Sequence, residues 1–427
     1  MKGVLIGLFF MFLGGLGFCQ AQTTADSLRL TLPQAEDQFR QRNLLLLATR
    51  LGINEQQAYL AQAKLFANPT IYIEQMPFNQ QTREFMPVGQ NNSEQVIQVQ
   101  QLLLLAGKRN KQLAIAATNI KLATDRFEDL LRTLSYQLRS AFYDLYYQQQ
   151  ALGVYEQESN TLSQTVALYQ QQFDKGNVPL KDLARLKAYL FSLSNERQQR
   201  LAQIADDQAT LSVLLNTAPD QLIRPVMAPM DDDPRRNPAT LSLDSLMAIA
   251  ERNRPDLRGY RDQLTAERQN LTLQKALAVP DLTLQGTYYR NAGYISNYFG
   301  VGVGVTLPFF NRNQGNIQAA RVRTQSSQQF ASAYQLQVEG ELQRSLTKVR
   351  QSDQLYRTFD RKFNSDFSRL IEGVTLNYRK QNIGVVEFLD FLDSYKMSQL
   401  QFIQLQNDRI QRLEELRLSI GADPFVN

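Results

Sequence analysis

Apolar residues recur along this chain at two spacings, one typical of helices and one typical of strands. From Leu113 to Phe173, steps of four and three residues define an apolar seam that only three polar residues interrupt. A heptad seam of this length predicts left-handed packing of long helices. Because no proline occurs in residues 88–178, we expect one helix of about 65 residues, about 100 Å long at 1.5 Å per residue.

Turn residues divide the helical part into two antiparallel hairpins. Gly176 and Pro179 mark the end of the first long helix, and Gly384 marks the end of the second. Returning helices are predicted over residues 180–215 and 385–418. A looser apolar seam predicts the second long helix, through Leu346, Val349, Tyr356, Phe363, Phe367, Leu370 and Val374.

Strand spacing appears once in each half of the chain. Residues 299–307 alternate between an apolar face and a face of glycine and threonine, and residues 282–289 repeat this theme. In the first half, residues 71–74 and 97–100 alternate in the same way. One apolar and one polar or small face are typical of strands that lie between lipid and a wet lumen. Two soluble hairpins packed on helices are the alternative interpretation.

Four strands are too few to close a barrel, since about eight are the practical minimum. A membrane barrel therefore requires several copies of the chain, each supplying two hairpins. The order of elements is the same in residues 22–215 and 241–427, which predicts two structural repeats. Residues 216–240, rich in proline, are expected to link them.

The first residues of the chain predict export. A charged start precedes the apolar run Val4–Phe18, which is too short for a spanning helix, and Cys19-Gln20-Ala21 follows. We interpret residues 1–21 as a signal peptide that is cleaved after Ala21. Lipid attachment at Cys19 is the alternative, although Phe18 occupies a position where a small residue is expected.

Composition argues against catalysis. The chain has no His, no Trp and one Cys, so the residues on which most metalloenzymes and nucleophilic triads depend are missing. We expect no enzyme activity, no cofactor and no bound metal. The net charge of +5 is spread along the chain without a basic block, so nucleic acid is not an expected partner.

With its duplicated helices and hairpins, the chain resembles the TolC family of outer-membrane efflux proteins over essentially its whole mature length. The crossing from strand to helix at residues 307–317, Leu-Pro-Phe-Phe-Asn-Arg-Asn-Gln-Gly-Asn-Ile, is similar to that of the heavy-metal members related to CusC and CzcC. Residues 105–109, at the corresponding place in the first half, match more weakly.

The resemblance implies a mostly α fold with a membrane β-barrel. A homotrimer would form a 12-stranded outer-membrane barrel that continues into a long periplasmic α-helical barrel. The helical tips would contact a periplasmic adaptor, or membrane fusion protein, coupled to an inner-membrane pump of the resistance-nodulation-division (RND) type. The matching tip residues here are Gly176, Asn177, Val178, Gln381, Asn382 and Ile383.

Glu387, Asp390 and Asp393 follow the second turn at intervals of three residues, so they share one side of a helix. The resemblance implies that Glu387 and Asp390 belong to an acidic ring at the periplasmic constriction, which would favour cations. Asp393 extends this candidate pore gate. A solvated helix face near an N-terminus, where acidic residues are favourable, is the alternative.

These expectations combine into one function, a passive exit duct of a tripartite efflux system that carries heavy-metal cations. Within the same fold, a drug or protein-export duct is the alternative. From another class, a soluble periplasmic coiled-coil tether or adaptor would have similar heptads.

Overall fold

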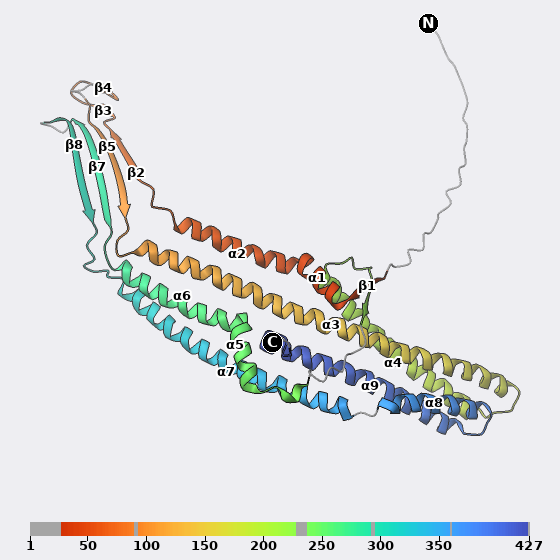
Figure 1. Cartoon of the computed structure of the whole chain (residues 1–427). Helices are drawn as coiled ribbons and strands as arrows, with labels where there is room; N and C mark the ends of the chain where they lie inside the picture. Colours follow the sequence, from red (N-terminus) through yellow and green to blue (C-terminus); the bar gives the residue numbers. More distant parts are fainter. Residues whose placement is uncertain (1–26, 89–92, 228–236, 292–294, 359–360, 426–427) are drawn as a thin grey trace, which may run out of the picture.

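The computed structural model describes residues 27–88, 93–227, 237–291, 295–358 and 361–425 (Figure 1). The predicted signal peptide and Cys19 lie outside the described residues, as do residues 228–236 of the predicted linker. The molecule is elongated, with a sheet at one end and the turns between long helices at the other (Figure 1).

The helices are α1 (Leu32–Arg42), α2 (Leu44–Ala63), α3 (Lys108–Asp174), α4 (Leu180–Leu215), α5 (Leu243–Asn253), α6 (Pro255–Leu277), α7 (Gln314–Thr358), α8 (Arg361–Arg379) and α9 (Val385–Ile420). The strands are β1 (Leu28–Thr31), β2 (Thr70–Gln75), β3 (Phe78–Asn79), β4 (Glu84–Phe85), β5 (Gln95–Leu103), β6 (Ile223–Val226), β7 (Leu282–Asn291) and β8 (Ser296–Val305). Within the described residues, no helix is both long enough and apolar enough to cross a membrane.

Helix α3 is a single helix of 67 residues, so the predicted long helix is confirmed. Every position of its apolar seam except the exposed Ala117 is buried or half-buried. The seam contributes to two separate apolar clusters, one around Leu138, Phe142 and Leu145 and one near the far end around Tyr155 and Leu162. A helix of this length cannot fold onto one globular core, so its packing is distributed along its axis.

The second long helix is described as two helices, α7 and α8, and residues 359–360 between them lie outside the described residues. Leu346, Val349 and Val374 are buried as the seam predicts, but Leu370 is 45% exposed in the single chain. The prediction is wrong at Leu370 because α8 packs mainly against α9. By contrast, α3 packs against α2, α4, α6 and α9 and therefore buries a wider face.

The four long strands form one antiparallel sheet in the order β2-β5-β7-β8. The register aligns Ile71, Val99, Gly286 and Val301 on one face, and its neighbouring rungs place Gln98, Thr287 and Gly300 on the other. The predicted apolar and polar faces are therefore confirmed. The apolar face is open to solvent in the single chain, where Val301 is 97% exposed. A short ribbon of β3 and β4 extends beyond the sheet.

An ion pair between the two repeats connects the start of α3 to the start of β7. Lys108, at the start of α3, is 3% exposed, and its Nζ lies 2.7 Å from Oδ1 of Asp281 and 2.6 Å from the carbonyl oxygen of Val279. The same carboxylate oxygen accepts the backbone amide of Leu105 at 2.9 Å. The Leu105–Lys108 crossing of the first repeat is thus tied to the start of β7 in the second.

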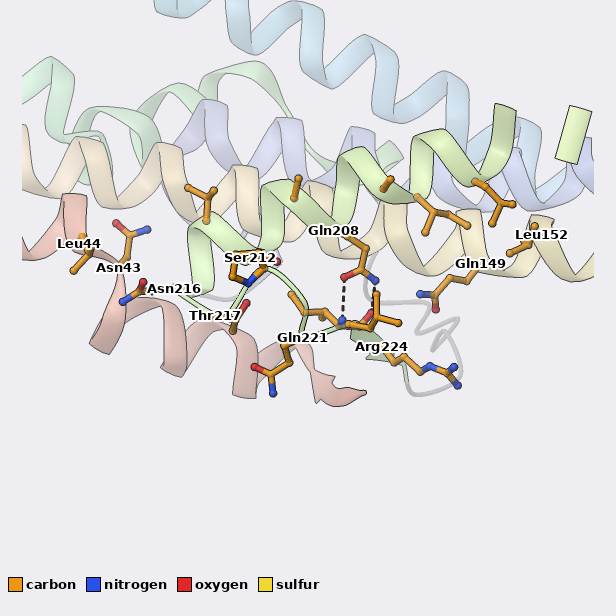
Figure 2. Close-up of a pocket in the computed structure, with 18 of the residues that line it drawn as sticks. Asn43, Leu44, Gln149, Leu152, Gln208, Ser212, Asn216, Thr217, Gln221 and Arg224 are labelled. Atoms are coloured by element: carbon orange, nitrogen blue, oxygen red, sulfur yellow. Dashed lines mark hydrogen bonds between the residues drawn. The ribbon is translucent and has the colours of Figure 1, made fainter. Parts of the chain in front are cut away.

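In the first repeat, Asn43 separates α1 from α2 close to the end of α4 (Figure 2). Its side chain donates to the carbonyl of Leu214 at 3.0 Å and accepts the amide of Leu46 at 3.0 Å, which caps α2. Asn216 ends α4 with a φ of +50°. Beside this break, β1 pairs in parallel with β6 from the linker, a pairing that the sequence did not predict.

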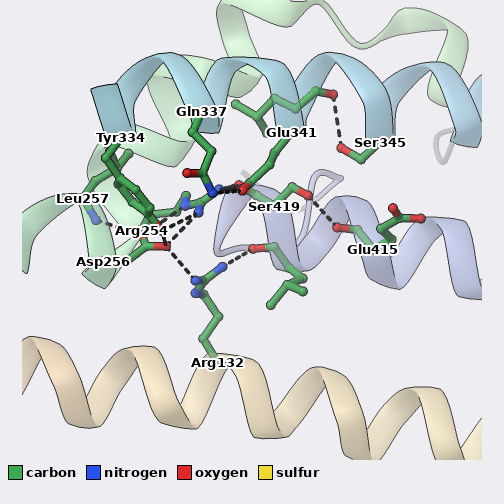
Figure 3. A network of polar contacts seen from close by, with 12 residues as sticks. Arg132, Arg254, Asp256, Leu257, Tyr334, Gln337, Glu341, Ser345, Glu415 and Ser419 are labelled. Atoms are coloured by element: carbon green, nitrogen blue, oxygen red, sulfur yellow. Dashed lines mark hydrogen bonds and ion pairs between the residues drawn. The ribbon is translucent and has the colours of Figure 1, made fainter. Parts of the chain in front are cut away.

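In the second repeat, a polar side chain at a break between two helices again bonds to the returning helix, but the residue is an arginine (Figure 3). Arg254 separates α5 from α6, is 2% exposed, and donates to the carbonyl of Ser419 near the end of α9 at 2.8 Å. Its guanidinium pairs with Asp256 at 2.7 Å, and Asp256 also pairs with Arg132 of α3 at 2.8 Å. Gly421 then ends α9 with a φ of +74°. A polar residue therefore holds the returning helix at the break in each repeat.

The helices form a layer with an open edge on each side. Nearer the sheet, α3 lies between α2 and α6, and α6 in turn contacts α7. Nearer the turns, α3 lies between α4 and α9, and α9 contacts α7 and α8. One edge therefore belongs to the first repeat (β2, α2 and α4) and the other to the second (β8, α7 and α8).

Candidate functional site at the helical tips

The two turns at the helical end have the same backbone geometry. Gly176 and Gln381 both occupy the left-handed region, with φ of +75° and +59°. In each turn this residue donates its amide to the carbonyl three residues back, at 2.8 and 2.9 Å. The asparagine that follows, Asn177 or Asn382, donates to the carbonyl five residues back at 2.9 Å. This paired bonding satisfies carbonyl groups that a helix end would otherwise leave free.

The position of the second reversal is a correction to the sequence prediction. Gly384 has an extended backbone, with φ of −79° and ψ of 163°, and is the N-cap of α9. The left-handed residue is Gln381 instead. Gly384 therefore predicted the correct loop but not the residue that reverses the chain. A residue other than glycine can adopt the left-handed conformation at a moderate cost.

The six predicted tip residues lie together at the end of the molecule. Gly176, Asn177, Gln381 and Asn382 are exposed, while Val178 and Ile383 are half-buried. Ile383 packs against an apolar cluster formed by both helical hairpins. We call this the tip cluster; it consists of Tyr155, Leu162, Leu186, Leu193, Val374, Tyr378, Val385, Phe388 and Leu392.

Three aromatic rings at the tip cluster join the two hairpins. Tyr378 of α8 stacks on Phe388 of α9 with ring centroids 4.0 Å apart and on Tyr169 of α3 with centroids 5.2 Å apart. Tyr378 is 1% exposed and Phe388 is fully buried. The exposed turns are therefore held in position relative to each other by the packed side chains of the tip cluster.

Of the three predicted gate residues, Glu387 and Asp390 differ in their surroundings from Asp393. All three side chains are exposed and follow the second turn on α9. The carboxylate of Asp393, however, lies 3.0 Å from the ammonium of Lys396 and accepts the hydroxyl of Tyr189 at 3.3 Å. Asp393 is therefore held within its own chain.

A buried polar cluster between the hairpins was not predicted from the sequence. Glu158 of α3 and Lys396 of α9 are 5% and 2% exposed, and both contact charged or polar residues of α4. Ser159, one of the polar residues in the seam of α3, was the only sequence signal near Glu158. It did not show which neighbouring helix would supply partners.

The described residues contain no group of three or more His, Cys, Asp or Glu side chains placed to hold a metal ion. A groove of about 1220 Å³ lies farther from the tips, between α3, α4 and the start of α2 (Figure 2). Its lining is largely apolar and includes Leu44, Leu152, Ile204 and Val213. Val213 is 77% exposed, so the groove lies open on the α4 edge of the layer.

Three solved outer-membrane proteins share this fold. The structure of CusC matches with a TM-score of 0.73 at 16% identity, over 92% of this chain and 92% of CusC. The CmeC outer membrane channel of Campylobacter jejuni matches with a TM-score of 0.75 at 13% identity, over 91% and 85% of the two chains. The MtrE channel of Neisseria gonorrhoeae, solved in its open state, gives 0.70 at 16% identity, over 92% and 89%.

At these identities the structural matches establish the fold alone. No curated protein sequence matches the chain. Residues 246–422 match the family described as outer membrane efflux protein. This match covers the second part of the chain, and the described chain as a whole has the fold of these outer-membrane channels.

Proposed function

We propose that three copies of this chain form the exit duct of a tripartite efflux system. The observation that carries the proposal is the pair of open edges. Strands β2 and β8 are the two ends of a four-stranded sheet, and the helical layer has matching open sides. An edge strand left unpaired invites pairing with another chain. Because the two edges come from different repeats, contact between them is head-to-tail, and such a contact can close a ring.

Three chains would supply twelve long strands, which is enough to close a barrel. The groove on the α4 edge, with Val213 at its rim, would be covered by the second-repeat edge of the next chain. The division into repeats at residues 22–215 and 241–427, with the linker at 216–240 and a signal peptide at 1–21, remains part of this proposal. So does the alternative of lipid attachment at Cys19.

We propose that the exposed turns dock a periplasmic adaptor that connects the duct to an RND pump. Asn177 and Asn382 present polar side chains at equivalent places in two turns of equal geometry. In a trimer this arrangement would repeat six times around the opening, so an adaptor could bind both turns in the same way.

The gate proposal assigns the narrow opening to Glu387 and Asp390. Three-fold symmetry would turn each exposed carboxylate into a ring of three, and such rings favour cations over anions. Replacing both residues with glutamine and asparagine should lower the cation preference of single channels in planar bilayers. Asp174→Asn, at the end of α3, is the control, because its exposed carboxylate lies before the first turn. Unchanged ion selectivity in the double variant would refute the acidic gate.

We propose heavy-metal cations as the cargo, on the resemblance of residues 307–317. Deletion of the gene should lower tolerance to metal salts and leave tolerance to organic toxins unchanged. The opposite pattern would assign the duct to drug efflux. A soluble monomer that runs identically on gels with and without heating would overturn the duct itself in favour of a periplasmic tether.

A further inference from the structure

Five polar residues, of which Glu158 and Lys396 are buried, form a cluster where the two helical hairpins meet, and we call them the interhairpin cluster. The tyrosine hydroxyl of Tyr189, on α4, lies 2.9 Å from Oε1 of Glu158 on α3 and 3.3 Å from Oδ1 of Asp393 on α9. The ammonium of Lys396, also on α9, lies 3.0 Å from Asp393 and 3.0 Å from Glu196 on α4. The cluster thus connects three helices from both hairpins.

The charges of this cluster do not balance. Three carboxylates, those of Glu158, Glu196 and Asp393, surround one ammonium group. Lys396 forms ion pairs with Glu196 and Asp393. Glu158 is 5% exposed, and its Oε2 is buried without a hydrogen-bond partner in the described part of the chain. An ionised carboxylate in this position lacks a full set of hydrogen-bond donors from the protein, which is costly.

These surroundings favour the neutral form of Glu158. Burial is the largest cause and raises the pKa of Glu158 to about 7. The hydrogen bond from Tyr189 and the charge of Lys396 lower the pKa, whereas the charges of Asp393 and Glu196 raise it. Burial lowers the pKa of Lys396, but its contacts with Asp393 and Glu196 outweigh burial, so that its pKa is raised and the ammonium stays charged.

The remaining side of Glu158 adjoins a cavity of about 440 Å³ between α3, α8 and α9. The charged groups that line it there are Glu372 and Arg379, both exposed, and Tyr395 of α9 is half-buried beside them. The cavity gives water and protons a route to Glu158 without separating the helices.

We propose that the interhairpin cluster is a proton-operated clasp, in which uptake of one proton by Glu158 strengthens the packing of α9 against α3 and α4. Loss of this proton leaves a second uncompensated negative charge between the hairpins and weakens their contact. Glu158 is thereby a positioning residue for the tips, because it acts through the helices that carry the turns and Asp393.

The direction of the pH effect follows from linkage. When the hairpins separate, Glu158 meets water and regains the ordinary pKa of a glutamate, near 4.5. The clasped form therefore binds more protons between that value and about pH 7. Its population relative to the released form is highest at and below pH 4.5, falls by up to about tenfold per pH unit as the pH rises toward 7, and is constant above.

Distances between spin labels on α4 and α9 of the full-length assembly in detergent test the clasp. Cysteines at Ser194 and Ser394, which are exposed and outside the interhairpin cluster, carry the labels. Dilution with unlabelled chains restricts the measurement to pairs within one chain. We expect one short distance at pH 5, and a second, longer population that grows toward pH 7.

Glu158→Gln retains the shape of the side chain but cannot ionise, so it should keep the short distance at pH 5 and at pH 8. Glu372→Gln, in the same cavity, should retain the response of the parent chain. Two results would overturn the proposal: distances in the parent chain that do not change with pH, or distances in the Glu158→Gln variant that change with pH as they do in the parent chain.

Tyr189→Phe gives a second measurement that does not depend on Glu158→Gln folding normally. It removes the hydrogen bond that favours the ionised form, so the transition should move to higher pH, and an unmoved transition would contradict the clasp. An effect of the clasp on conduction rests on the proposed function, and it is measured separately as single-channel conductance at pH 5 and pH 8. If the label distances change with pH but the conductance does not, the clasp is supported and its effect on conduction is refuted.

Discussion

At the scale of single residues, the two turns show how one backbone shape is reached from two sequences. Gly176 and Gln381 take the same left-handed conformation and make the same pair of amide hydrogen bonds. Glycine adopts this conformation without a steric penalty, whereas a residue with a Cβ pays about 1–2 kcal/mol. The second turn therefore stores strain that the first does not.

Exchanging these residues provides a matched pair of variants. Gln381→Gly should raise the free energy of unfolding by about 0.5–1 kcal/mol, because relief of strain exceeds the added freedom of the unfolded chain. Gly176→Gln should lower it by a similar amount, since no atom lies within 4 Å of the added Cβ and only the backbone penalty remains. Thermal unfolding followed by circular dichroism measures both, and equal shifts of the same sign would contradict the strain argument.

At the scale of elements, the break between α5 and α6 depends on a buried carboxylate. Asp256 accepts hydrogen bonds from Arg254, Arg132 and the hydroxyl of Tyr334, the last at 2.7 Å (Figure 3). Burial raises the pKa of Asp256, but the hydrogen bond from Arg254 and the charge of Arg132 outweigh burial and lower it below its usual range. The contacts of Asp256 with α3 and α7 are therefore strongest while Asp256 is ionised.

Because the pKa of Asp256 is lower in the folded chain, its stabilisation is present above the ordinary pKa of an aspartate and is lost as the pH falls through the folded value. Asp256→Asn should lower the free energy of unfolding at pH 7 by about 3 kcal/mol, since the buried guanidinium of Arg254 and the half-buried guanidinium of Arg132 each lose one carboxylate partner. The difference from the parent chain should shrink in acid. Asp129→Asn, which removes a half-exposed partner of Arg132, should cost less than about 1 kcal/mol. Denaturant titrations at several pH values measure these effects.

Strand β8 carries the most exposed apolar side chains of the sheet. Val301 and Phe299 are 97% and 76% exposed on the face shared with Ile71 and Ile73. A surface this apolar is stable only when it is covered, and in the proposed outer-membrane barrel lipid would cover it.

Val301→Arg should impair insertion, because a cation on the lipid face costs about 2–4 kcal/mol near the middle of the bilayer. Gln285→Arg lies on the adjacent rung, opposite Gly302, and on the other face, so it should insert normally. The yield of protein in outer-membrane fractions measures both variants. Equal yields would show that this face does not contact lipid.

At the scale of the whole molecule, the proposed trimer makes each chain one segment of a tube. The sheet ends at β2 and β8, and the helical layer ends at α4 on one side and at α7 and α8 on the other. The tube closes only between chains, so the proposed trimer would form its wall from three equivalent contacts.

Cysteine pairs across the sheet edges test this closure. Ile71→Cys in β2, combined with cysteine at Phe299, Val301, Val303 or Val305 of β8, should give covalent multimers upon oxidation for at least one pair. Ile71→Cys with Gly302→Cys is the control, because Gly302 faces the opposite side of the sheet. Non-reducing gels detect the products. The absence of multimers from all four pairs would argue against pairing of β2 with β8.

The elements with a long, repeated pattern were predictable from the sequence. The helix at residues 108–174 and the alternation through Val301 and Val303 involve many residues with the same spacing, so single exceptions do not obscure them. Gly384 and Leu370 were misinterpreted because each depends on one local circumstance. The left-handed residue of the second turn is Gln381, and Leu370 lies on a helix with few neighbours. The buried pair Glu158 and Lys396 comes from positions 238 residues apart, and no spacing rule connects them.

The sequence by itself determined the length of α3 and the two faces of the strands, because these depend on the periodic placement of apolar side chains along one element. Only the tertiary structure decided which elements are neighbours. It joined β5 to β7 across the repeats, paired β1 with β6, placed Arg254 and Asp256 against Arg132, and enclosed Glu158 between two hairpins. Such contacts depend on charge, burial and distance between segments far apart in the chain, and these quantities exist only once the chain has folded.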